Sequence, residues 1–280
     1  MTAVLLGLAS AVAFGAADFL AGVLSRRTHF AVIGLISQVG ATAGVWAVLP
    51  WFGGTGPSAM ALGWGAASGL GGGVGSLALY RGLGHGQMNV VAPLSAVGGA
   101  ALPALAGIAL GERPSSVAFA GIVLALPALW LIARPADTAR ASTVAGVGDG
   151  LLAGAGFALL FIALDRAGDR SGLWPVAAGQ LAALLVLAGF VLVRRPTWAG
   201  AGRRAAAGVA VLVGLLSVTA TLLYFLATHA GLLTVVAVLA SLYPAITVVL
   251  AALVLRERAS LVQRVGLVAA TAAVAMVTLA

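Results

Sequence analysis

Apolar residues come in blocks of about 20 along this chain, the length that a helix needs to cross the hydrocarbon core of a membrane. Of its 280 residues, 62% are hydrophobic and only 8% are charged, whereas soluble domains hold about 25% charged residues. Backbone N–H and C=O groups find no water in hydrocarbon, so a spanning segment is a helix or a strand of a closed barrel. The blocks are continuous and lack the two-residue alternation of barrel strands. The sequence therefore predicts an all-α membrane protein.

Ten such blocks lie between turn-rich or polar connections. Ten helices of this length use about 220 residues, which leaves no stretch for a soluble catalytic domain. Arg26 is the first basic residue, so the first block lacks the charged start of a signal peptide and is expected to remain as a span. The predicted spans are 2–24, 30–50, 61–80, 88–110, 116–133, 144–164, 173–193, 205–228, 231–255 and 261–279.

The third to fifth spans are repeated, with changes, in the eighth to tenth. Leu79-Tyr80 aligns with Leu223-Tyr224, and a histidine follows each tyrosine at the same spacing. With one residue inserted, the Glu-Arg pairs that follow the fourth and ninth spans also align. Five spans are an odd number, so the second copy runs through the membrane in the opposite direction. We therefore predict two inverted five-helix repeats, at 1–134 and 143–280, joined by a short polar connection at 135–142.

The third span is rich in glycine. Gly65, Gly69 and Gly73 are spaced four residues apart, so they share one face of a helix. Small residues on such a face allow two helix backbones to approach closely in a membrane. We therefore predict close packing of this span against a neighbouring helix. That these glycines also let the helix flex or slide during transport is the alternative.

These motifs resemble the drug/metabolite transporter superfamily, and within it the EamA-like transporter family. That family places a Glu-Arg pair at the end of the fourth span of each half and a glycine in the fifth. The resemblance implies ten helices, secondary transport of small metabolites, and a central cavity lined by helices one to four and six to nine. The Glu-Arg pairs are expected to fix the turn between helices. The matching residues are Glu112, Arg113 and Gly121 in the first half and Pro244, Glu257, Arg258 and Gly266 in the second, with Gly99 where the first half would have its proline.

Asp18 lies inside the first span. A carboxylate at the centre of a membrane helix costs about 2.5–3.5 kcal/mol on insertion scales, so it should face protein or water. Two interpretations stay open. Asp18 binds substrate or a proton, or it reaches Arg26 or the membrane interface or pairs structurally with another helix.

Further polar residues inside spans are candidates for substrate binding or coupling. Gln38 and Gln180 lie at matching places in the second and seventh spans, where an amide offers donors and an acceptor without charge. A hydrogen bond between helices is their alternative role. Proline in the fourth and ninth spans frees backbone carbonyls, which suits a site at the middle of the membrane. The remaining candidates are Tyr80 and Tyr224, with a place at the membrane interface as their alternative, and Asn89, Ser95, Ser241 and Tyr243.

The net charge of +8 comes from arginine alone, since the chain has no lysine. The arginines are grouped at span ends, which predicts contact with lipid headgroups and no nucleic-acid partner. Most of them follow odd-numbered spans. The positive-inside rule places those connections in the cytoplasm and both termini outside, whereas the family resemblance places the termini inside. Both orientations stay open, and the expected location is a bacterial cytoplasmic (inner) membrane.

The sequence holds no cysteine and no Gly-x-Ser-x-Gly, His-Glu-x-x-His or Gly-x-x-x-x-Gly-Lys motif. We therefore predict a protein that is not an enzyme and uses no metal or cofactor. The predicted function is secondary active transport, as an exporter of a small polar or amphipathic metabolite driven by protons or a counter-solute. An intramembrane enzyme acting on lipid and a non-transporting scaffold are the alternatives. Its partners would be the lipid bilayer and the substrate, with monomer and homodimer both open.

Overall fold

Eleven helices make up the described part of the chain, and no strand occurs in it. The structure is a computed structural model that describes residues 1–25, 29–84, 88–133, 143–196, 203–256 and 259–279. The helices are α1 (Thr2–Ser25), α2 (Phe30–Phe52), α3 (Ala59–Gly84), α4 (Met88–Ala109), α5 (Ser116–Ile132), α6 (Thr143–Arg166), α7 (Trp174–Arg194), α8 (Arg203–Ala230), α9 (Leu233–Ala240), α10 (Tyr243–Val254) and α11 (Leu261–Leu279).

The predicted all-α membrane fold is confirmed. Within the described residues, eight helical segments are long and apolar enough to cross a membrane by length and composition, with α9 and α10 counted as one. α5 is a shorter apolar helix of 17 residues, and the glycine-rich α3 does not count among the eight. Large apolar side chains such as Leu185 and Leu253 are exposed on the molecule, where lipid tails would cover them.

The ninth predicted span is a broken helix. The predicted span over 231–255 is confirmed as one candidate membrane span, Leu233–Val254, but its helix is interrupted, because α9 ends at Ala240 and α10 begins at Tyr243. Pro244 lies in the first turn of α10. Proline has no N–H to donate to the preceding turn, and it disfavours helical backbone in the residue before it. The chain therefore makes a short turn in the middle of the span, at Ser241 and Leu242.

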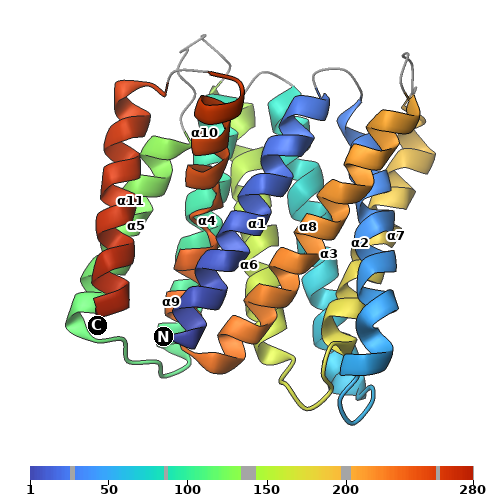
Figure 1. Cartoon of the computed structure of the whole chain (residues 1–280), viewed down its shortest axis with the longest axis horizontal. Coiled ribbons are helices and arrows are strands. Elements are labelled where there is room, and N and C mark those ends of the chain that lie inside the picture. The colour runs from blue at the N-terminus through green and yellow to red at the C-terminus, as the bar shows by residue number, and fades with distance from the viewer. Residues whose placement is uncertain (26–28, 85–87, 134–142, 197–202, 257–258, 280) are drawn as a thin grey trace.

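The helices lie beside one another and run between two faces of the molecule, and both chain ends lie at the same face (Figure 1). We call this the lower face, as Figure 1 is drawn, and the opposite one the upper face. α1 rises from the lower face and α6 descends from the upper one, so the corresponding first helices of the two predicted repeats are antiparallel (Figure 1).

Many contacts between helices have an equivalent contact in which the two halves of the chain swap roles. α3 packs against α6 and α7, and the corresponding α8 packs against α1 and α2. α4 packs against α6, and α9 and α10 pack against α1. α2 contacts its counterpart α7, and α5 contacts its counterpart α11. A two-fold axis between two five-span copies would give these pairings, and the division into repeats at 1–134 and 143–280 stays a prediction.

Glycine brings several of these helices into close contact. A Cβ on Gly69 of α3 would lie 2.8 Å from Cα of Gly179 on α7, and one on Gly73 would lie 3.0 Å from Cβ of Val186. The predicted close approach along the glycine face of the third span is therefore confirmed. Gly121 of α5 and Gly266 of α11 are packed in the same way against each other's helices, so these two motif glycines join the outermost pair of helices.

Candidate substrate cavity

A cavity of about 190 Å³ lies in the middle of the bundle. Residues from α1, α2, α3, α4, α6, α7, α8 and the α9–α10 break line it, and none of its described lining residues comes from α5 or α11. In terms of spans, these are the first to fourth and the sixth to ninth, the set that the family resemblance implies. The lining includes six of the residues chosen from the sequence: Asp18, Gln38, Ser95, Gln180, Ser241 and Tyr243.

The other three candidates do not contribute to the described lining. The side chains of Tyr80 on α3 and Asn89 on α4 lie outside the described residues. Tyr224 on α8 is fully buried below the cavity, where its hydroxyl donates to the carbonyl oxygen of Phe161 at 3.2 Å. α8 continues past Tyr224 to Ala230, and the side chain of Tyr224 is packed inside the bundle.

Asp18 is exposed and lines the cavity, so a ligand in the cavity can reach its carboxylate. The half of α1 that carries it is held against α10. A Cβ on Gly15 would lie 2.6 Å from the carbonyl oxygen of Tyr243, and the hydroxyl of Thr247 donates to the Gly15 carbonyl at 3.1 Å. The rings of Phe14 and Tyr243 lie 6.2 Å apart. These contacts fix the backbone that presents Asp18 beside the helix break.

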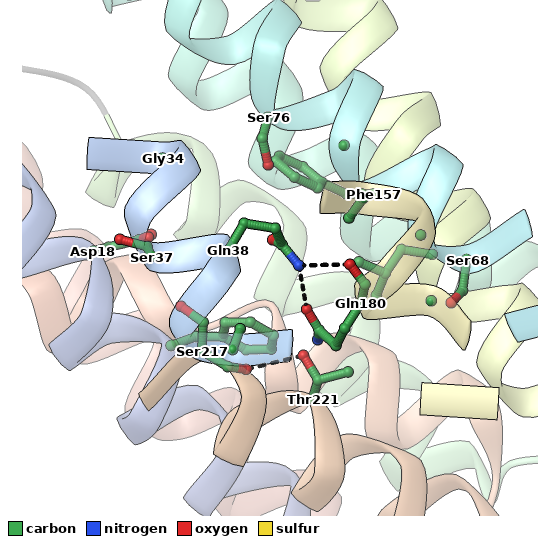
Figure 2. Close-up of a pocket in the computed structure, with 18 of the residues that line it drawn as sticks. Asp18, Gly34, Ser37, Gln38, Ser68, Ser76, Phe157, Gln180, Ser217 and Thr221 are labelled. Carbon is green, nitrogen blue, oxygen red and sulfur yellow. Dashed lines mark hydrogen bonds between the residues drawn. The ribbon is translucent and has the colours of Figure 1, made fainter. Parts of the chain in front are cut away.

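The two glutamines bond to each other across the cavity (Figure 2). Gln38 Nε2 donates to Gln180 Oε1 at 2.5 Å and to the Gln180 carbonyl oxygen at 3.0 Å. In Figure 2, Asp18 and Ser37 lie on one side of this amide pair, and Ser68 and Phe157 lie on the other. The pair therefore joins α2 to its counterpart α7 and leaves an amide surface toward the cavity.

Hydroxyl groups add polarity to the lining. Those of Ser68, Ser95 and Thr221 donate to carbonyl oxygens of their own helices at 2.7, 2.9 and 2.9 Å. Ser37 Oγ and Ser241 Oγ are buried and, within the described residues, have no hydrogen-bond partner. A buried hydroxyl without a partner is costly. Both residues line the cavity, but each Oγ is itself covered by neighbouring atoms. Ser37 was not among the candidates chosen from the sequence.

Packed apolar side chains close the cavity toward the lower face. One hydrophobic core cluster joins Leu49, Leu164, Leu173, Tyr224 and Leu233, which lie near the lower ends of α2, α6, α7, α8 and α9. All five are 8% exposed or less. The cavity lining reaches Ala21, Ile33 and Leu79 in the upper parts of α1, α2 and α3, and at its lower end it includes Leu164 and Val176 of the same cluster.

Residues 145–279 match the model of the EamA-like transporter family. This part of the chain is an EamA-like domain. The match confirms the family that the sequence motifs resemble, and proteins of this family are membrane proteins that are generally transporters. A solved crystal structure is similar to the chain with a TM-score of 0.76 and 19% sequence identity, over 99% of this chain and 96% of that one; at this identity the likeness shows the fold alone. A comparison with curated proteins finds no match.

The Glu112 motif ties the first half of the chain to the EamA-like domain. The carboxylate of Glu112, which follows α4, accepts hydrogen bonds from the N–H groups of Leu233 and Thr234 at 2.6 and 2.8 Å, and from the Thr234 hydroxyl. Glu112 therefore caps the start of α9, where Leu232 offers no side-chain cap. The neighbouring Arg113 is exposed. The second pair, Glu257 and Arg258, lies outside the described residues.

An ion pair across the halves was not predicted. Arg81 near the end of α3 donates through Nε to Asp149 Oδ1 of α6 at 2.9 Å, and its Nη2 also contacts that oxygen. The Asp149 side chain is 8% exposed and that of Arg81 is 56% exposed. Both residues lie in apolar helices, in the third and sixth spans. A charged residue among apolar ones needs a partner, so the sequence could have indicated this ion pair. Within the described residues, no three His, Asp or Glu side chains are grouped to hold a metal ion.

Proposed function

We propose that the chain is a secondary active transporter that exports a small polar or amphipathic metabolite by alternating access. The central cavity carries this proposal. It lies between the two predicted repeats, it is lined by the spans that the EamA-like resemblance implies, and it holds an accessible carboxylate inside the bundle. An ionisable residue inside a membrane protein marks a substrate or ion path more often than a structural feature.

Alternating access needs one end of the cavity to be closed while the other is open. The core cluster at the lower end supports this reading, because it packs apolar side chains against the part of the lining formed by Leu164 and Val176. Rocking one repeat against the other around this site would open the lower end and close the upper one. The break between α9 and α10 lies at the cavity, where transporters use interrupted helices to place polar backbone within the membrane.

We further propose that the protein resides in a bacterial cytoplasmic membrane, that a proton or counter-solute gradient drives export, and that Asp18 and the two glutamines take part in binding or coupling. Asp18 is a carboxylate that can gain or lose a proton. Gln38 and Gln180 join the two halves across the cavity, so movement of the halves would change their bond.

The test is transport into proteoliposomes, with a mixture of polar and amphipathic metabolites offered with and without an imposed proton gradient. We expect uptake of at least one compound, dependent on the gradient or on a trapped counter-solute, and a loss of more than tenfold in Asp18→Asn. Asp169→Asn is the matched control, because Asp169 is exposed in a loop at the lower face. No flux above that of protein-free liposomes for any compound would overturn the function. Full rate and unchanged pH dependence in Asp18→Asn would remove Asp18 from the mechanism.

A further inference from the structure

The charge of the cavity lining is single-signed. Among its lining residues that the structure describes, Asp18 is the only charged one. Within the described lining, no arginine or histidine neutralises Asp18 or holds a negative group of a ligand. Arg26, the partner considered from the sequence, lies outside the described residues. A carboxylate attracts a cation and repels an anion most strongly where water is scarce. The lining therefore selects against substrates that carry a carboxylate or phosphate.

The internal duplication shows where this charge departs from symmetry. Phe14, Asp18 and Ala21 of α1 line the cavity, and Phe157, Phe161 and Leu164 of α6 line it with the same spacing. The aligned pairs are therefore Phe14 with Phe157, Asp18 with Phe161, and Ala21 with Leu164. The first pair keeps its aromatic ring in both copies, whereas the second replaces a carboxylate by a phenyl ring.

The aligned second and seventh spans likewise have one pair of cavity residues that is the same in both copies and one pair that differs. Gln38 and Gln180 are equivalent and both line the cavity, while Ser37 is equivalent to Gly179. The first copy thus carries the carboxylate and an additional hydroxyl, and the second carries an additional ring and no hydroxyl at these positions. In Figure 2, Asp18 and Ser37 lie on one side of the glutamine pair and Phe157 on the other.

The two buried hydroxyls without a partner belong with Asp18. Ser37 lies on α2, and Ser241 lies at the break that leads into α10, the helix packed against α1. A protonated primary amine has three N–H donors. The Asp18 carboxylate is the exposed acceptor, and rotation of the Ser37 and Ser241 side chains toward the cavity would add their two covered oxygens to it. The opposite wall, with Phe157, Leu160 and Phe161, offers only apolar surface to the rest of the molecule.

Building on the proposed function, we propose that the transported substrate is a small amphipathic monoamine: a protonated primary amine joined to an apolar or aromatic group, without a carboxylate. The amine is held by Asp18, Ser37 and Ser241, and the apolar group lies against the α6 wall. The cavity of about 190 Å³ is smaller than the roughly 300–1,000 Å³ of pockets that bury drug-sized ligands, which restricts the substrate to one ring or a short chain.

The test compares four probes in proteoliposomes with the purified protein: 2-phenylethylamine, the neutral 3-phenylpropan-1-ol, the anion phenylacetate and the zwitterion phenylalanine. After subtraction of the flux into protein-free liposomes, we expect wild type to transport the amine at least tenfold faster than any of the others at equal concentration. Asp18→Asn should reduce amine transport to the level of the alcohol, and Asp18→Glu should retain the preference for the amine. Ser37→Ala and Ser241→Ala should each lower the rate of amine transport severalfold and leave the rate of alcohol transport unchanged.

Ethanolamine tests the apolar wall, because it keeps the amine and lacks the ring. We expect it to be transported at least tenfold more slowly than 2-phenylethylamine by wild type, and Phe157→Ala to narrow that difference. Asp169→Asn should behave as wild type with every probe.

Two kinds of failure are distinguishable. If no probe and no compound of the broader mixture crosses with wild type, the transport function itself fails. If the alcohol, the anion or the zwitterion crosses as fast as the amine, or if folded Asp18→Asn keeps the preference for the amine, the monoamine inference fails while transport stands.

Discussion

Replacing Glu112 tests how the two halves of the chain are held together at the lower face. Its carboxylate accepts two N–H groups at the start of α9 and the Thr234 hydroxyl. In Glu112→Gln, the single amide oxygen can accept only some of these three hydrogen bonds. The NH₂ group, which is itself a donor, then faces another donor. A hydrogen bond to a charged group contributes about 1.5–3 kcal/mol, and a charge at a helix start about 0.3–1 kcal/mol. Because Glu112 is half-buried, we expect a loss of about 2–3 kcal/mol.

The assay is reversible denaturant unfolding of the detergent-solubilised protein, followed by fluorescence of its six tryptophans. Arg113→Gln is the matched control, since Arg113 is the exposed neighbour whose guanidinium makes one long hydrogen bond, of 3.3 Å, to the Glu112 carbonyl oxygen. It should change the free energy of unfolding by less than about 0.5 kcal/mol.

A double-mutant cycle with Thr234→Val measures the interaction between Glu112 and the start of α9. It distinguishes loss of this cap from a general destabilisation of the loop. Residues in direct contact couple by about 0.5–3 kcal/mol, so the double variant should be more stable than the sum of the single losses predicts. The reasoning is refuted if Glu112→Gln unfolds with the same free energy as Arg113→Gln. Strict additivity with Thr234→Val would also refute it.

Three further substitutions test the packing between the halves, each measured by the same unfolding assay. Arg81→Gln leaves the buried Asp149 carboxylate without its partner, and we expect a loss of about 1–3 kcal/mol, part of which Asp149→Asn should restore in the double variant. Gly69→Ala places a Cβ 2.8 Å from Cα of Gly179, so the helices must separate at a cost of about 1–3 kcal/mol. Gln38→Leu removes the donor to its partner amide and should cost only about 0.6 kcal/mol, while substrate transport, measured in proteoliposomes, should fall severalfold because the amide lines the cavity.

The helices themselves could be predicted closely from the sequence, because membrane thickness fixes their length. The last span was predicted at 261–279, and α11 is Leu261–Leu279. The break in the ninth span could not. Pro50, Pro93 and Pro127 lie inside α2, α4 and α5 without ending those helices, so a proline alone does not predict a break. Around Pro244, the packing of α10 against Gly15 of α1 accompanies the interrupted backbone.

The residues of the candidate site that could be predicted are those whose strongly polar side chains are rare inside a membrane span. Asp18 and the two glutamines stand out in apolar sequence, and the structure places all three at the cavity. Ser37 does not stand out, because serine is common in membrane helices and only the rotation of α2 aims it inward. The contacts of Glu112 and Asp149 lie far away in sequence, at residues 233–234 and 81. Such pairings depend on how the two halves dock, which no local pattern records.

The predicted duplication would account for the paired helix contacts, and the positions at which its two copies differ give the cavity its chemistry. Two identical copies would surround the cavity with equal walls, so a substrate could bind in either of two orientations related by the axis. Three pairs of aligned positions break that equivalence. Asp18 aligns with Phe161, Ser37 aligns with Gly179, and Pro244 aligns with Gly99. The first two departures place the carboxylate and a hydroxyl on the first copy, and the third breaks the span that packs against α1. A bound molecule with one polar and one apolar end would therefore keep a single orientation, and its polar end would stay with α1 and α2 while the halves rock around it.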